Sequence, residues 1–183
     1  PRSTLFPYTT LFRSLRYRLT SQQHTIPQHG PLLQWVTRQS LRLQHQRISG
    51  AWMCQVSLDG VMSEQQLRGK QQYGAMASLR LRYDPSSPWQ FSGFLNLFST
   101  DGFDARLYAY QPQLPSTGAF PSFYGTGCSG VVVVTWRLSP AWTVASRIAL
   151  IHHLNRPHRS NSSSSEEQSD YSMRLGLWAR YRF

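Results

Sequence analysis

Arginine is the residue type through which this chain could do chemistry, because a guanidinium group forms paired hydrogen bonds with carboxylates and phosphates. Lys70 is the single lysine among 19 basic residues. Most of the arginines stand at alternate positions of segments that have the pattern of β-strands, so one face of each strand would be cationic. The predicted cationic face comprises Arg16, Arg18, Arg38, Arg42, Arg80, Arg82, Arg137, Arg147, Arg174, Arg180 and Arg182. Such a face would favour anions, but simple solvation or pairing with further strands would explain these arginines equally well.

Catalytic chemistry is indicated more weakly, and we expect a non-enzymatic protein. The alternative is a hydrolase in which Asp101 or Asp104 orients a histidine base, His152 or His153, at the rim of a barrel. A metal site at His152, His153 and His158 would match no established ligand spacing. With no glycine-rich phosphate loop or nucleophile elbow, the sequence predicts no cofactor and no metal.

Charge and cysteine content narrow the class of protein. The formal charge of +11 is typical of proteins that bind nucleic acid or an anionic surface, but the arginines are scattered singly, so we expect no direct nucleic-acid binding. Cys54 and Cys128 fall near opposite ends of their predicted strands, too far apart for a disulfide. The longest strongly apolar run is 131–134, far short of the roughly 20 residues of a membrane helix.

The last strand shows most clearly how the arginines would be positioned. From Tyr171 to Phe183 the odd positions are almost all apolar, whereas the even positions include three arginines. The same alternation predicts strands within 15–19, 34–46, 52–59, 73–83, 89–98, 131–138 and 142–150. Predicted short turns at 47–50, 84–88 and 139–140 alternate with predicted long loops at 20–33, 62–72, 99–127 and 153–169. The result is an up-and-down antiparallel sheet of about eight strands.

Residues 1–14 resemble a translated sequencing adapter, and we exclude them from the fold prediction. The native part is then 15–183, and Leu15 would lie within a strand whose beginning has been lost. We therefore expect a longer natural protein with further strands.

Aromatic residues cluster on the apolar faces close to the predicted short turns and the chain end. They are Trp52, Tyr83, Trp89, Trp136, Trp142, Tyr181 and Phe183. Aromatic girdles of this kind are typical of the membrane interface. The alternative is a soluble β-sandwich or lipocalin-like binding protein with these rings in its core.

Three segments carry a resemblance to a known family. Asp101–Tyr110, Phe120–Gly127 and the terminal strand resemble the carboxyl-terminal barrel region of certain bacterial outer-membrane proteins that can carry a helix-hairpin-helix module upstream. The resemblance implies a bacterial outer-membrane location and recognition of the terminal strand by the barrel-assembly machinery. No helix-hairpin-helix segment is present in this chain, so no DNA-binding role follows.

These observations predict an all-β protein, namely an antiparallel up-and-down transmembrane β-barrel. We expect the barrel to be truncated, so that its strands form either an open or a closed sheet. Its predicted function is that of a non-enzymatic pore or surface-binding scaffold whose arginine-rich lumen favours anionic solutes, with its apolar face in contact with lipid. The hairpin within 99–127 is expected to stand beyond the membrane plane.

Overall fold

The computed structural model describes residues 11–25, 33–65, 70–115, 120–155 and 170–182, and they form an antiparallel sheet of eight strands. The strands of the sheet are β1 (Leu11–Thr25), β2 (Leu33–Ser49), β3 (Trp52–Gln65), β4 (Lys70–Tyr83), β5 (Trp89–Thr100), β8 (Thr126–Arg137), β9 (Trp142–Asn155) and β10 (Tyr171–Tyr181). A short 3₁₀ turn, η1 (Phe103–Ala105), and a small hairpin of β6 (Leu107–Tyr108) and β7 (Ser122–Phe123) lie between β5 and β8.

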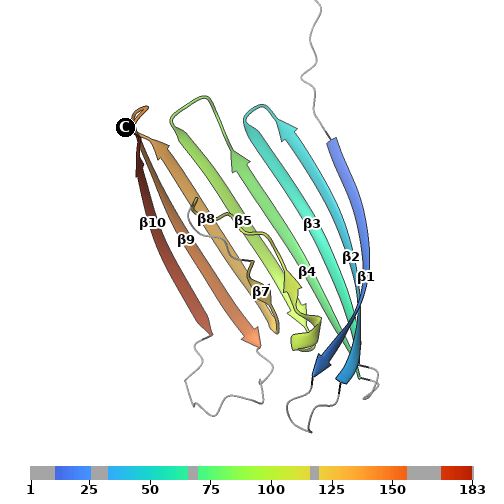
Figure 1. Cartoon of the computed structure of the whole chain (residues 1–183). Coiled ribbons are helices and arrows are strands. Elements are labelled where there is room, and N and C mark those ends of the chain that lie inside the picture. Colours follow the sequence, from blue (N-terminus) through green and yellow to red (C-terminus); the bar gives the residue numbers. More distant parts are fainter. Residues whose placement is uncertain (1–10, 26–32, 66–69, 116–119, 156–169, 183) are drawn as a thin grey trace, which may run out of the picture.

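Each strand of the sheet pairs with its neighbours in chain order, which confirms the predicted up-and-down topology. The turns between β2 and β3, β4 and β5, and β8 and β9 lie at the same edge of the sheet as the end of β10 (Figure 1). The sheet is curved, with β1 at one side and β10 at the other. These two strands are not paired with each other, so the described sheet is an open one.

Several strands are longer than their sequence patterns indicate. The predicted loop 62–72 is largely strand, since β3 extends to Gln65 and β4 begins at Lys70. β1 extends to Thr25 and β9 to Asn155, into regions also predicted to be loops. Polar residues there carry no apolar alternation, but their main chains continue the hydrogen-bonded ladder. β1 begins at Leu11, so its first four residues belong to the segment predicted to derive from an adapter.

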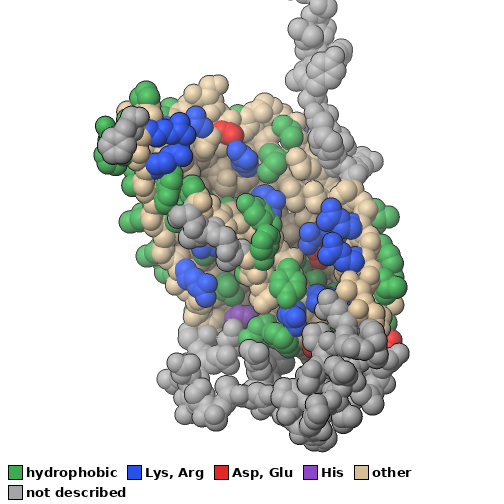
Figure 2. Space-filling view, in the orientation of Figure 1, with side chains coloured by type: hydrophobic (Ala, Val, Ile, Leu, Met, Phe, Trp, Pro, Cys, Tyr) green, Lys and Arg blue, Asp and Glu red, His purple; other side chains and the backbone are tan. Residues whose placement is uncertain are grey.

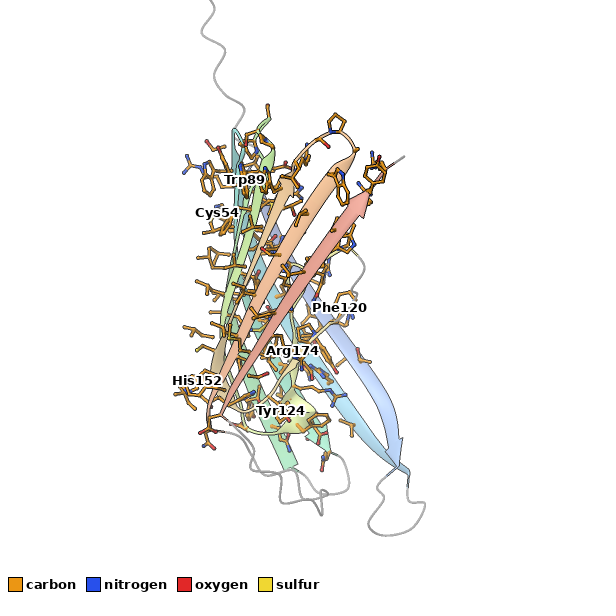
Figure 3. The ribbon with its side chains drawn as sticks, turned by 90° about the vertical axis from the view of Figure 1, so that its left-hand side faces the viewer. Cys54, Trp89, Phe120, Tyr124, His152 and Arg174 are labelled. Atoms are coloured by element: carbon orange, nitrogen blue, oxygen red, sulfur yellow. The ribbon has the colours of Figure 1, made fainter. Side chains whose placement is uncertain are left out.

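The alternation of side chains separates the sheet into two different faces, as the sequence predicts. On the convex face, large apolar side chains of all eight strands are exposed, among them Leu41, Leu58, Leu95 and Ile148. Figure 3 shows Trp89, Cys54 and His152 on this side and Arg174, Phe120 and Tyr124 on the concave side. Cys54 and Cys128 are both free cysteines.

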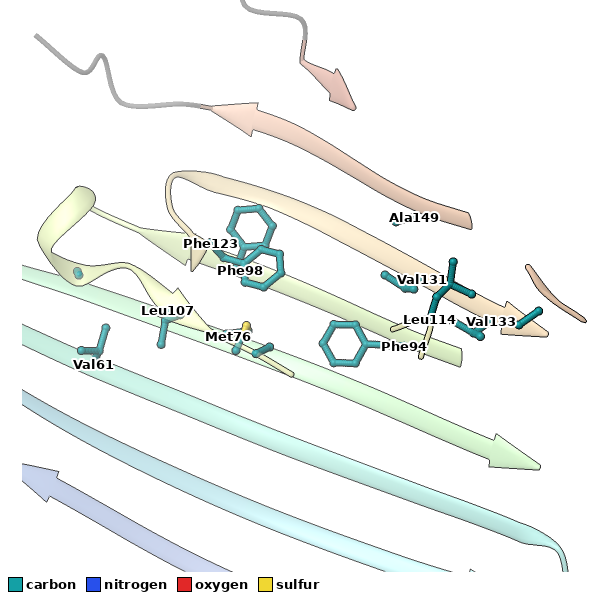
Figure 4. Close-up of a cluster of buried hydrophobic side chains, with 13 residues drawn as sticks. Val61, Met76, Phe94, Phe98, Leu107, Leu114, Phe123, Val131, Val133 and Ala149 are labelled. Carbon is teal, nitrogen blue, oxygen red and sulfur yellow. The ribbon is translucent and has the colours of Figure 1, made fainter. Parts of the chain in front are cut away.

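The hydrophobic core lies on the concave face, where residues 101–115 and 120–125 fold back over the sheet. This inner segment, described at 101–115 and 120–125, packs Leu107, Leu114 and Phe123 against Phe94 and Phe98 of β5 and against other inward side chains (Figure 4). The Phe98 and Phe123 rings are 5.1 Å apart. The prediction of a hairpin beyond the membrane plane is therefore wrong. The hairpin forms, but burial of its apolar side chains draws it onto the sheet.

A glycine on β4 allows the inner segment to approach the sheet closely. A Cβ atom added at Gly74 would lie 2.5 Å from the carbonyl oxygen of Ala105 and 2.8 Å from Cγ1 of Val61. Ala105 is completely buried at this point. Gly60, on the adjacent strand β3, has nothing within 4 Å of the same position. The absence of a side chain at Gly74 is thus a condition for docking of η1.

We predict that Gly74→Ala displaces the inner segment and that Gly60→Ala does not. Overpacking of this kind costs about 1–3 kcal/mol, and proteolysis reports the population of the opened form. Limited trypsin digestion should cleave after Arg106 faster in Gly74→Ala than in the unchanged protein. Equal cleavage rates in the two variants would contradict the docking role of Gly74.

Candidate functional site

Four arginines of the predicted cationic face bind the protein's own main chain. Each donates a hydrogen bond to a carbonyl oxygen of the inner segment. The pairs are Arg38 Nη2 with Arg106 O, Arg42 Nη2 with Tyr108 O (3.2 Å), Arg80 Nη2 with Tyr110 O, and Arg147 Nε with Pro112 O (3.0 Å). The acceptors are alternate residues of an extended segment, so their carbonyl groups point the same way. Together these four arginines form a latch between β2, β4, β9 and the inner segment.

The latch arginines also contact aromatic rings of the segment that they hold. The guanidinium carbon of Arg80 lies 5.0 Å from the centre of the Tyr110 ring and 5.9 Å from that of Phe94. Arg38 lies 5.8 Å from the Tyr108 ring. A planar guanidinium can face a ring and donate hydrogen bonds in its own plane, so one side chain serves both contacts.

A buried polar network extends the latch, and the sequence analysis did not find it. Gln111 Nε2 donates to Ser129 Oγ at 3.2 Å, and Ser129 Oγ donates to Asn96 Oδ1. Arg147 Nη2 donates to Gln111 Oε1 at 3.3 Å. Asn96 and Ser129 are paired across β5 and β8 and both are buried. The available signal was an amide, Asn96, between two phenylalanines on the inward face of β5, and a hydroxyl, Ser129, beside valines on the inward face of β8.

The remaining predicted arginines lie elsewhere on the concave side. Arg82 forms an ion pair with Asp84 at 2.8 Å, and Arg137 lies 4.0 Å from the same carboxylate, in the turn between β4 and β5. Arg180 and Arg182 line a cavity of about 470 Å³ near the short-turn edge, together with Arg137. Arg174, on β10, is exposed. No single site gathers the whole predicted set.

A larger cavity lies on the same concave face, toward the β1 edge of the sheet, and five arginines line it. It has a volume of about 570 Å³ and lies between β1, β2, β3 and the inner segment. We call it the β1–β3 cavity. Its arginines are Arg16, Arg18, Arg38, Arg42 and Arg106, and its acids are Asp59 and Asp104. Figure 2 shows basic side chains gathered over this part of the concave face.

The two acids of the cavity are already engaged. Asp59 is buried and forms an ion pair with Nε of Arg42. Asp104 accepts a hydrogen bond from Nε2 of Gln65. Arg16 and Arg18 form no ion pair or side-chain hydrogen bond with any described residue. Positive charge therefore exceeds negative charge among the residues that line the cavity.

The residues considered for hydrolysis are engaged in other contacts. Asp101 accepts a hydrogen bond from the main-chain N–H of Tyr73 at 3.0 Å. His152 and His153 point to opposite faces of β9, with His152 stacked on Tyr171 of β10 at 4.1 Å and His153 buried near Phe98. The hydrolase alternative stays a prediction. Within the described residues no group of three or more His, Cys, Asp or Glu could hold a metal ion, and His158 lies outside these residues.

The aromatic residues near the short turns form three pairs between neighbouring strands. Trp52 lies 4.5 Å from Tyr83, Trp89 stacks on Trp136 at 4.6 Å, and Trp142 lies 5.0 Å from Tyr181. Each pair joins residues in direct register, so the six rings follow the same edge of the sheet on its convex face. Phe183 lies outside the described residues.

The comparisons with family models, with curated proteins and with solved structures found no match. Among the residues that the structure describes, none belongs to a helix of the length and apolarity needed to cross a bilayer.

We predict that Arg80→Met loosens the inner segment, because it leaves the Tyr110 carbonyl without its charged donor. Hydrogen bonds to charged groups contribute about 1.5–3 kcal/mol. Amide hydrogen exchange measured by mass spectrometry in detergent should therefore accelerate across 107–112. Arg82→Met is the control, since its exposed ion pair contributes about 0–1 kcal/mol. Equal protection of this segment in Arg80→Met and the unchanged protein would show that Arg80 does not latch it.

Proposed function

We propose that this chain forms part of the wall of a bacterial outer-membrane β-barrel and acts there as a non-enzymatic scaffold whose arginine-rich interior binds anionic solutes. The exposed apolar convex face carries this proposal. Leu95 and Leu97 of β5 are 60% and 65% exposed, and Leu175 and Leu177 of β10 are 70% and 84% exposed. A contiguous apolar surface across eight strands is far larger than the few hundred Å² that soluble monomers expose.

The position of the core supports the same proposal. In a soluble sandwich the large apolar side chains of a sheet pack against a second layer. Here the inner segment provides a second layer only for the concave face, and nothing among the described residues covers Trp89, Trp142, Leu175 or Leu177. Hydrocarbon is the medium in which such a convex face is stable. In that medium the outer edges of β1 and β10 must pair with each other or with further strands.

The inner segment favours a binding scaffold over an open pore. It occupies the concave face at the level of β4, β5 and β8, and the latch arginines hold it there. Solute would bind beside this segment in the remaining arginine-lined space. The terminal strand β10, which has apolar odd positions and two arginines among its even positions, is the segment that we propose the barrel-assembly machinery recognises.

We predict that Leu177→Arg weakens membrane insertion. A charged residue at the bilayer midplane of a barrel strand costs about 2–4 kcal/mol, whereas on the surface of a soluble protein the same change has an effect within about 0.5 kcal/mol. The full chain should be refolded with phosphatidylcholine vesicles and its flotation measured. The unchanged protein should float with the vesicles, and Leu177→Arg should float less.

The matched control is Ser172→Arg, which places the same charge on the same strand with its side chain toward the concave side. It should insert like the unchanged protein. Failure of the unchanged chain to associate with vesicles, together with a soluble and folded state, would overturn the membrane proposal.

A further inference from the structure

We infer that the β1–β3 cavity is a binding site for an organic oxyanion, a small molecule with a phosphate or carboxylate group attached to a flat aromatic body. This inference rests on the proposed function, because β1 forms one side of the cavity and its outer edge must be paired in a complete barrel. It names the class of anionic solute and the residues that would recognise it.

The first observation is a concentration of positive charge that the protein itself does not balance. Arg16 on β1 lies directly opposite Arg42 on β2, and Arg18 is the next inward residue along β1. Side chains directly opposite in an antiparallel pair have Cβ atoms about 4.5–5.5 Å apart, and like charges there are destabilising. Asp59 neutralises Arg42 alone. A bound anion would relieve the repulsion that remains at Arg16 and Arg18.

The second observation is that the latch positions two further cations of the cavity. Arg38 and Arg42 are held by their bonds to the carbonyl groups of Arg106 and Tyr108. Arg106 is fixed in turn by its Nε hydrogen bond to Tyr108 Oη at 2.5 Å and by its position 4.4 Å over the Phe103 ring. Cations that are already ordered lose little conformational entropy when a ligand arrives. Arg16 and Arg18 then supply the free donors.

The third observation is an aromatic wall facing these cations. Tyr108, Tyr110 and Phe120 line the same cavity from the inner segment. The Tyr110 and Phe120 rings are 6.1 Å apart, and Phe120 is 72% exposed on the concave side (Figure 3). An exposed phenyl ring inside the curve of the sheet does not contact lipid. It gives a flat ligand a surface on which to stack.

Together these features define the ligand class. A cavity of about 570 Å³ is within the size range of small-molecule sites. Guanidinium groups bind planar carboxylates and phosphates through paired hydrogen bonds, which a halide ion cannot form. The aromatic wall would add affinity for a ligand with a ring and none for inorganic phosphate.

Isothermal titration calorimetry of the full chain in detergent, with phenyl phosphate and inorganic phosphate as probes, tests this inference. Phenyl phosphate should bind about three- to tenfold more tightly than inorganic phosphate. Arg18→Gln should weaken the binding of both probes by about tenfold or more, because a charge-assisted hydrogen bond is lost. Phe120→Ala should remove the advantage of phenyl phosphate and leave the binding of inorganic phosphate unchanged.

Arg174→Gln is the matched control, since Arg174 is an exposed arginine of the concave side that does not line the cavity. Circular dichroism should show the same strand content in all variants. Equal weakening by Arg18→Gln and Arg174→Gln would show diffuse charge attraction and overturn the site, as would an absence of binding. Calorimetry in detergent does not depend on vesicle insertion, so a chain that inserts but does not bind contradicts the anion site and leaves the membrane proposal standing.

Discussion

Buried main-chain groups need hydrogen-bond partners, and on the concave side of this protein that need determines how the inner segment is held. The inner segment crosses the face of the sheet, and among the described residues its strand pairing with itself is limited to Leu107 with Phe123 and Tyr108 with Ser122. Carbonyl groups brought to such a surface must find donors or lose the free energy of their hydration. The latch arginines provide those donors at every second residue, so the docking of the segment and the positions of the arginines depend on each other.

This arrangement also explains why the protein has apolar residues on both faces of one sheet. Phe94, Phe98 and Val131 point to the concave side and need the inner segment to cover them. Leu95, Leu97 and Val132, which alternate with them along the same strands, point to the convex side and have no protein cover among the described residues. A sheet that is apolar on both faces requires two coverings. The inner segment provides one, and the proposed lipid contact provides the other.

The alternation of side chains made most of the sheet predictable. Every strand of the sheet was found from its period of two, and the short turns followed from glycine, proline, serine and aspartate at the strand ends. The last residues of β3 and the first residues of β4 were not predictable from this alternation. There the side chains are polar on both faces, and only main-chain pairing continues the strand.

The position of the inner segment could not be derived from periodicity, because it depends on contacts between residues far apart in the chain. Arg147 and Pro112 are 35 residues apart, and Arg42 and Tyr108 are 66 residues apart. The sequence placed the arginines on the correct face, but a main-chain carbonyl acceptor has no sequence signature. A count of cationic side chains therefore overestimated the number that remain free to meet an anion.

The basic residues that line the cavity are all arginines, and their planar guanidinium groups make contacts that a lysine could not make. A lysine ammonium could donate to one carbonyl group, but it would not present a flat face to Tyr108 or Tyr110 while doing so. The guanidinium of Arg42 bonds Asp59 through Nε and the Tyr108 carbonyl through Nη2, and so connects β2, β3 and the inner segment. Arg16, directly opposite on β1, has no carboxylate or carbonyl partner among the described residues. Two adjacent arginines thus differ in role: Arg42 has a protein partner, whereas Arg16 is free to bind the anion that we infer for the cavity.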